Sequence, residues 1–228
     1  MKISAIIVAA GSSRRMGFDK LAADLAGESV LSRSILAFQA CPEVVEIRVV
    51  TSPEKIAPVT AGAERLGITK FVEALKGGAE RHFSVNVGLS RVGAGMDLVA
   101  VHDGARPLVS SQAITHCAEV AMETGAASLA HRVTDTLKRA DENSDVSGSV
   151  SRHDLWAMET PQIFRVELLR RAYAEVLGAG ALVTDEVSAI EALGEKVRLV
   201  ENHEPNLKIT VPGDLVVAAA VLGVAKPR

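Results

Sequence analysis

Short apolar runs alternate along the chain with segments in which apolar residues recur at helical spacing. The first run, ISAIIVAA at residues 3–10, ends at a glycine. Further buried strands are predicted at residues 47–51, 69–72, 97–101, 127–130 and 197–200, and helices at residues 30–38, 84–92, 112–122, 166–176, 186–193 and from Pro212 onward. This alternation is typical of an α/β protein in which helices cover both faces of a mostly parallel sheet.

The segment from about residue 133 to 157 breaks this alternation. It carries the polar turn DENSD at residues 141–145 and the run SGS at residues 147–149, between two extended pieces. A polar excursion of this length is either a functional arm or lid, or a disordered surface loop. No internal repeat divides the chain, so residues 1–228 are interpreted as one domain that carries this excursion.

Composition argues against two classes of protein, nucleic-acid-binding proteins and membrane-spanning proteins. The formal net charge is -3 and aromatic residues make up 3% of the chain, which argues against a nucleic-acid-binding protein. No uninterrupted apolar stretch reaches the roughly 18 residues of a membrane span. Cys41 and Cys117 are the two cysteines and have no metal-ligand spacing, so we expect free thiols in a reducing, cytoplasmic compartment.

The loop after the first predicted strand is the strongest candidate for a binding site. Its sequence, AAGSSRRMG at residues 9–17, lies where open α/β sheets collect ligands. Small residues let backbone N–H groups approach phosphate oxygens, and Arg14, Arg15 and Lys20 add positive charge. The glycine spacing fits neither a dinucleotide-binding nor a Walker loop. The pattern indicates a phosphate-binding loop, with a strand followed by a solvated basic turn as the alternative.

Residues 9–31 resemble the opening signature of sugar-phosphate and cofactor nucleotidyltransferases, which have Ala-Ala-Gly, Arg-Met-Gly and a nearby lysine. The resemblance implies a Rossmann-like nucleotidyltransferase fold with a mostly parallel sheet and an extended β-arm. It also implies that Arg15 and Lys20 hold a triphosphate and stabilise charge at the α-phosphorus.

Later segments narrow the resemblance to one family. They are GGAERHFSV at residues 77–85, VHDGARP at 101–107, DTLK at 135–138, LWAMETPQIF at 155–164, TDEVS at 184–188 and NLKIT at 206–210. In this order the segments resemble the 2-C-methyl-D-erythritol 4-phosphate cytidylyltransferase family of the non-mevalonate isoprenoid route. The family transfers CMP from CTP to 2-C-methyl-D-erythritol 4-phosphate and releases pyrophosphate.

The resemblance implies a role for each matching residue. On the nucleotide side these are Ala10, Gly11, Gly78, Arg81, Ser84, Asp103 and Gly104, with Asp103 also holding Mg²⁺. On the acceptor side they are Arg106, Thr136, Arg152, Thr184 and Lys208, of which Arg152 and Lys208 are also expected to be catalytic. In that family the arm at about residues 133–157 reaches across a homodimer, which implies that Arg152 serves the neighbouring subunit's site.

The chain departs from the family pattern at three places. Residues 18–21 are FDKL where Pro-Lys-Gln is usual, Gly104 replaces an alanine, and Glu159 stands where glutamine is frequent. His102, beside Asp103, is expected to orient its loop through hydrogen bonds rather than to transfer protons.

Other functions remain open at this point. A ribitol 5-phosphate cytidylyltransferase would share most of these elements, and the first loop also resembles molybdopterin cytidylyltransferases. A non-catalytic nucleotide-binding module would have no use for Lys20, Asp103 and Lys208 together. A glycosyltransferase would be expected to carry an Asp-x-Asp motif after the fourth strand, where Asp103 stands without one.

Overall fold

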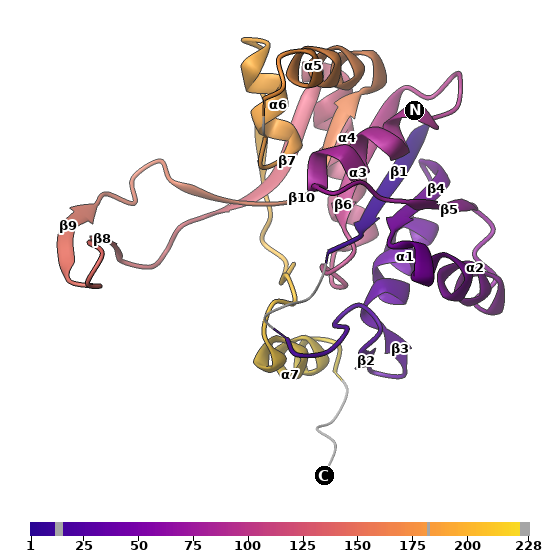
Figure 1. Cartoon of the computed structure of the whole chain (residues 1–228), viewed down its shortest axis with the longest axis horizontal. Coiled ribbons are helices and arrows are strands. Elements are labelled where there is room, and N and C mark those ends of the chain that lie inside the picture. Colours follow the sequence, from indigo (N-terminus) through magenta and orange to yellow (C-terminus); the bar gives the residue numbers. More distant parts are fainter. Residues whose placement is uncertain (12–15, 182, 224–228) are drawn as a thin grey trace.

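The computed structural model describes residues 1–11, 16–181 and 183–223. In this part of the chain, a seven-stranded sheet is covered by helices and accompanied by two two-stranded ribbons (Figure 1). The strands of the large sheet are β1 (Ile3–Ala9), β4 (Val44–Thr51), β5 (Phe71–Lys76), β6 (Leu98–Asp103), β7 (Ala126–Arg132), β10 (Trp156–Arg165) and β11 (Arg198–Glu201). The helices are α1 (Val30–Ala40), the 3₁₀ turn η1 (Pro53–Lys55), α2 (Ile56–Arg65), α3 (Arg81–Ser90), α4 (Ser111–Thr124), α5 (Val166–Gly178), α6 (Glu186–Ala192) and α7 (Pro212–Val221).

The sheet is mostly parallel, as the sequence predicts. Its strand order is β11-β7-β10-β6-β1-β4-β5, and only β10 runs antiparallel to its neighbours within the described sheet. The chain continues from β1 to β4 on one side of β1, whereas β6 pairs with its other side. This reversal of strand order at β1 creates the kind of crevice in which open α/β sheets bind ligands.

Side chains that alternate along β1 pack against helices on both faces of the sheet. Ile3, Ala5, Ile7 and Ala9 pack into a core with α1, α4 and part of α2, whereas Ile6 packs into a second core with α3, α5 and α6. Successive side chains of a strand point to opposite faces, so a continuous apolar run indicates a strand that is buried on both sides.

The turn-rich excursion takes the form of a β-ribbon arm. Strands β8 (Leu137–Ala140) and β9 (Val146–Val150) pair antiparallel, and Figure 1 shows them extending well away from the body of the molecule. No residue from 131 to 158 is buried within the single chain. The arm therefore contributes no buried residue to the core of the chain.

The local predictions were incomplete around residues 52–70. The structure has helix α2 there, which the sequence pattern did not indicate, and a small ribbon of β2 (Asp24–Leu25) and β3 (Glu28–Ser29) earlier in the chain. The strand predicted at residues 69–72 begins at Phe71 and continues to Lys76. Pro58 lies in the first turn of α2, where its missing N–H removes no helical hydrogen bond, so it does not interrupt the helix.

Every helix in the described ranges is too short or too polar to cross a membrane.

Candidate active site

A pocket of about 390 Å³ lies where β1 and β6 end. Its lining comes from four segments: the loop after β1, the turn into α3, the end of β6 and the segment before α7. The lining residues that the sequence had also singled out are Ala10, Gly11, Lys20, Gly78, Arg81, Ser84, Asp103 and Lys208. The structure thus brings eight predicted site residues, spread over almost 200 positions, into one pocket at the strand crevice.

Two consecutive glycines, Gly77 and Gly78, form a close-packed wall beside this pocket, and Gly78 lines it. A Cβ atom at Gly77 would lie 2.8 Å from both the Ala10 Cβ and the Ser84 Oγ, and a Cβ at Gly78 would lie 2.4 Å from the Phe83 Cβ. The Gly78 N–H donates to the Ser84 Oγ at 3.1 Å, which ties the turn to helix α3. Only glycine permits this approach, because any side chain would collide with the loop after β1 or with α3.

Asp103 is held between two cations at the carboxyl end of β6. Its Oδ2 accepts from the Lys208 Nζ at 2.6 Å, and its Oδ1 lies 3.2 Å from the Arg81 Nη2. Burial alone would raise the pKa of Asp103, but the charges of Arg81 and Lys208 lower it well below its ordinary value. The carboxylate is therefore fixed in its ionised form at neutral pH.

The segment that carries Lys208 is fixed to the body by backbone contacts. The Ile209 N–H donates to the Ala105 carbonyl at 2.8 Å, just beyond the end of β6. The Lys20 Nζ donates to the Ile209 carbonyl at 2.7 Å from the loop after β1. Lys20 and Lys208 both line the pocket, and the Lys20 contact with the Ile209 carbonyl links the two segments that carry them. Arg15, the other cation expected in this loop, lies outside the described residues.

Arg106 and His102 support the pocket from behind. The Arg106 guanidinium donates to the carbonyls of Asn206 at 2.7 Å and Met158 at 3.2 Å, so it joins the Lys208 segment to β10. His102 is fully buried and makes contacts of 3.1 Å with the Arg106 carbonyl and with the Thr160 hydroxyl. Burial lowers the pKa of His102 to about 4, so the ring is neutral at pH 7. These contacts link the ring to the loop after β6 and to β10, as expected for a residue that orients its loop.

Gly104 faces inward rather than lining the pocket. A Cβ there would meet the Leu31 Cδ1 at 2.9 Å and the Val8 carbonyl at 3.2 Å. Its own N–H donates to that carbonyl at 2.9 Å, which continues the pairing of β6 with β1. Any nucleotide contact at Gly104 would therefore have to involve its backbone.

Besides Arg106, which lies behind the pocket, three acceptor-side residues do not line the pocket within the single chain. Thr136 and Arg152 lie on the arm, where the Arg152 guanidinium donates to the Thr134 carbonyl. Thr184 lies just before α6, 3.3 Å from the Ser188 hydroxyl through its own Oγ1. The lining of the pocket includes none of the three.

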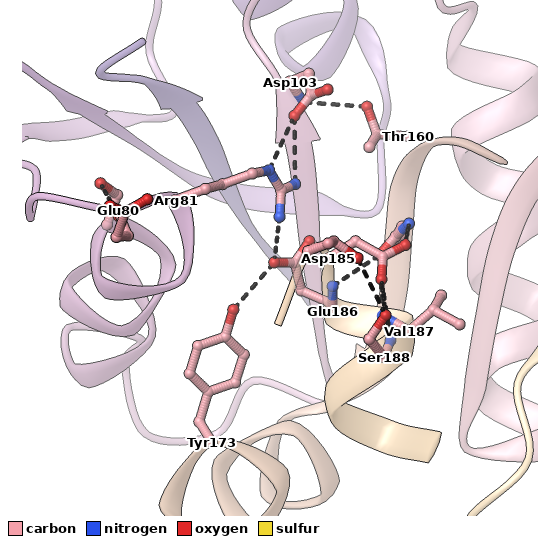
Figure 2. A network of polar contacts seen from close by, with 12 residues as sticks. Glu80, Arg81, Asp103, Thr160, Tyr173, Asp185, Glu186, Val187 and Ser188 are labelled. Atoms are coloured by element: carbon pink, nitrogen blue, oxygen red, sulfur yellow. Dashed lines mark hydrogen bonds and ion pairs between the residues drawn. The ribbon is translucent and has the colours of Figure 1, made fainter. Parts of the chain in front are cut away.

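Sequence reasoning missed a polar network beside the pocket, which Figure 2 shows. Glu186 is fully buried, lies 2.6 Å from the Arg81 Nη1 and accepts from the Tyr173 hydroxyl at 3.0 Å. The available signal was the Thr-Asp-Glu sequence at the predicted start of α6, since Asp185 caps this helix by accepting from the Ser188 N–H at 3.0 Å. The burial of the neighbouring glutamate depends on tertiary contacts and could not be read from that signal.

The family model described as 2-C-methyl-D-erythritol 4-phosphate cytidylyltransferase matches residues 3–224. The chain belongs to this family. The protein of that name from Caldanaerobacter subterraneus subsp. tengcongensis is 42% identical, with 97% of this chain and 99% of the relative covered. The protein of the same name from Geobacillus thermodenitrificans is 38% identical, with 97% of each chain covered.

Solved structures agree with this assignment. The 2-C-methyl-D-erythritol 4-phosphate cytidylyltransferase from Thermus thermophilus superposes with a TM-score of 0.82 and is 31% identical, covering 98% of this chain and 100% of that one. The 4-diphosphocytidyl-2C-methyl-D-erythritol synthase from Anaerococcus prevotii superposes with a TM-score of 0.84 at 28% identity, covering 97% and 98%. The predicted nucleotidyltransferase fold is confirmed, and the family is one of enzymes.

Proposed function

We propose that this chain transfers the cytidylyl group of CTP to 2-C-methyl-D-erythritol 4-phosphate, giving 4-diphosphocytidyl-2-C-methyl-D-erythritol and pyrophosphate in isoprenoid precursor synthesis. The observation that carries the proposal is the pocket at the ends of β1 and β6, in a member of this family. It combines Lys20, Arg81, Asp103 and Lys208 within one site. A module that only binds nucleotides would not need this set of charges.

The shape of the pocket suits a nucleoside triphosphate. The Gly77–Gly78 wall and Ser84 offer closely approachable backbone and one hydroxyl, which fit the flat, polar edge of a cytosine ring. Ala10, Gly11 and Lys20 line the same pocket from the loop after β1, where backbone N–H groups and a fixed cation suit phosphate oxygens. In this assignment the base lies toward α3 and the triphosphate toward the loop after β1.

The chemistry needs positioning and charge rather than a general base. The acceptor phosphate is mostly dianionic at neutral pH because its second pKa is near 6. One of its oxygens attacks the α-phosphorus, a new phosphorus–oxygen bond forms, the α–β anhydride bond breaks, and both electrons leave with pyrophosphate. Lys20 and Lys208 would offset the repulsion between the two anions, while neutral, buried His102 takes no part in proton transfer.

Mg²⁺ fits the donor set at Asp103. No group of three or more His, Cys, Asp or Glu side chains able to hold a metal occurs in the described ranges. Asp103 offers an ionised carboxylate at the pocket, and Mg²⁺ is typically held by one or two carboxylates together with substrate phosphates. When bound, the ion would supply charge neutralisation along the triphosphate.

The arm fits a role in a homodimer. Thr136 and Arg152 lie on a ribbon that buries nothing in its own subunit, and both are expected to receive the acceptor phosphate. A two-fold dimer that places each arm over the partner's pocket would bring Arg152 opposite Lys208 and complete the acceptor half of the site.

The two cysteines support the expected compartment. Cys41 and Cys117 are both buried and free, as is usual in a reducing environment such as the cytoplasm. Burial raises the pKa of each thiol, which keeps both in the unreactive protonated form.

The test is pyrophosphate release by the purified protein with Mg²⁺. CTP, ATP, GTP and UTP are each combined with 2-C-methyl-D-erythritol 4-phosphate or ribitol 5-phosphate. We expect release only with CTP and the methylerythritol phosphate, and its loss in Lys20→Ala. Lys2→Ala, a surface lysine at the other end of β1, is the matched control.

Each other outcome changes the proposal in a defined way. Release with ribitol phosphate would replace the acceptor and keep the mechanism. Release that Lys20→Ala leaves intact would remove Lys20 from the catalytic site. Absence of release across all combinations would contradict the proposed function.

A further inference from the structure

Arg81 is shared unequally between two carboxylates. Its Nη1 lies 2.6 Å from the Glu186 Oε1, whereas its Nη2 and Nε lie 3.2 and 3.4 Å from the Asp103 Oδ1. Charge-assisted N–H···O contacts are strongest near 2.7–2.9 Å and weaken as they lengthen. Glu186 is therefore the anchor of this guanidinium, and Asp103 is its looser partner (Figure 2).

Glu186 is itself held rigidly. Its side chain is fully buried, its Oε1 accepts from the Tyr173 hydroxyl, and its backbone N–H donates to the Gln162 Oε1 at 3.2 Å. Its second oxygen, Oε2, is buried without a hydrogen-bond partner among the residues that the structure describes. A buried carboxylate oxygen in this state retains capacity to accept a hydrogen bond from the guanidinium.

Both oxygens of Asp103 are already in contact with cations. Lys208 holds Oδ2 at 2.6 Å, and Arg81 approaches Oδ1 at 3.2 Å. A divalent cation can bind this carboxylate only by displacing one of these contacts or sharing an oxygen with it. The Arg81 contact is the longer one, and Arg81 has a second carboxylate on which to remain paired.

We propose that Glu186 is a positioning residue that anchors Arg81 and so keeps the Oδ1 atom of Asp103 available to the divalent cation of the CTP complex. This inference rests on the proposed function for the presence of CTP and the metal. Without the anchor, Asp103 would be the remaining carboxylate partner of Arg81 among the described contacts. The guanidinium would then pair fully with Asp103 and compete with the metal for the same oxygen.

The test is Mn²⁺ binding to the whole protein in the presence of CTP, followed by electron paramagnetic resonance. Mn²⁺ replaces Mg²⁺ because both prefer carboxylate and phosphate oxygens. Glu186→Gln keeps the shape of the side chain and removes its charge. We expect the Mn²⁺ dissociation constant of the CTP complex to rise about tenfold. The matched control is Glu191→Gln, the same change at an exposed position of α6, with an expected change of less than about twofold.

A double-mutant comparison separates positioning from a purely structural role. Replacing Arg81 by methionine removes the group through which Glu186 is inferred to act. The double variant Arg81→Met/Glu186→Gln should therefore bind Mn²⁺ at least as tightly as Arg81→Met alone, rather than showing a further tenfold loss. Tyr173→Phe removes only the hydroxyl that supports Glu186, and we expect a rise of about two- to threefold in the dissociation constant.

The outcomes distinguish the inference from the function on which it rests. Wild-type Mn²⁺ affinity in Glu186→Gln would overturn the positioning role while leaving the proposed reaction intact. A loss of thermal stability with unchanged affinity would show a structural role only, and would also overturn it. If Glu186→Gln does not fold, unchanged affinity in Tyr173→Phe overturns the inference. Absence of Mn²⁺ binding by the wild-type CTP complex would contradict the metal's place in the proposed function, and the inference with it.

Discussion

Asp103 and Arg152 are both expected at the reaction centre, yet their surroundings differ completely. Asp103 is 8% exposed and in contact with two cations at the end of a central strand. Arg152 is exposed on an arm none of whose residues is fully buried in the single chain. The pocket that we propose for the nucleotide is thus preorganised within one chain, whereas Thr136 and Arg152, which we propose for the acceptor, lie outside that pocket.

The charges in the body and the charges on the arm should therefore contribute to the reaction in different ways. Charges held in the body keep fixed distances, which allows them to stabilise a transition state without reorganisation. Charges on the arm are solvated in the single chain, so their effect depends on being brought into a less solvated setting. The following predictions test this division, beginning with the largest expected effect.

Removing a cation from the body should have the largest effect on the reaction. Lys208→Ala eliminates the contact of 2.6 Å to Asp103 and a positive charge at the pocket. We expect kcat/KM to fall about 100- to 1,000-fold, in line with the loss of one preorganised electrostatic contact. Steady-state pyrophosphate release measures the effect. Lys196→Ala, at an exposed position before β11, is the control, and a comparable loss there would indicate a non-specific effect of charge.

Mixing two inactive variants tests whether the arm serves the partner's site. We expect Lys208→Ala to inactivate the part of the site in the body and Arg152→Ala the part on the arm. In an equimolar mixture of freely exchanging dimers, half of the dimers are heterodimers, and each would contain one intact site. We therefore expect about a quarter of wild-type activity after subunit exchange, from two variants that are nearly inactive alone. Failure to recover activity despite demonstrated exchange would place Arg152 in its own subunit's site.

Acid should lower the free energy of unfolding of the protein through protonation of His102 in the unfolded state. The pKa of this buried ring is lowered to about 4, below the ordinary value of 6.5, so between these pH values the unfolded state binds more protons than the folded state. The free energy of unfolding should consequently fall as pH falls through this window, by about 1 kcal/mol per pH unit. Urea unfolding at several pH values between 7 and 4.5 measures this slope.

Two substitutions assign that slope. His102→Gln should reduce the pH dependence, because the group that gains a proton on unfolding is gone. His153→Gln, the same change at a ring that is 85% exposed on the arm, is the matched control, and we expect it to keep the slope of the unmodified protein. An unchanged slope in His102→Gln would assign the pH dependence to other groups.

The smallest effect is expected where an ion pair is short but exposed. Arg65 lies 2.6 Å from Glu28, the same distance that separates Arg81 from Glu186, but the Arg65 side chain is 60% exposed. We expect Arg65→Ala to change the free energy of unfolding by less than about 1 kcal/mol, because solvent screens the pair. Thermal unfolding measures this, and a loss of several kcal/mol would show that distance matters more than burial.

The fold could be predicted from the sequence where the pattern of apolar residues was strong. The continuous apolar run of β1 indicated burial on both faces, and the structure places its alternate residues in two different cores. Helix α2 escaped prediction because Pro53, Pro58 and Gly62 weaken the helical pattern of its segment. Its packing against β5 provides the stability that local propensity does not.

The residues of the candidate site were likewise predictable in part. Motif resemblance named Lys20, Arg81, Asp103 and Lys208, and the pocket brings all four together. It assigned no role to Glu186, because a glutamate at the start of a helix is ordinarily solvated and only tertiary packing buries this one.

By itself, the sequence determined the class of fold, the edge of the sheet at which the site would form and the chemical type of most residues in it, because these follow from local periodicity and from motifs. Only the tertiary structure decided that Arg81 lies closer to Glu186 than to Asp103, that a Cβ at Gly104 would meet β1, and that the arm extends away from the body of the molecule. Those features depend on distances between segments far apart in the chain, and distance and burial determine how strongly two charges interact.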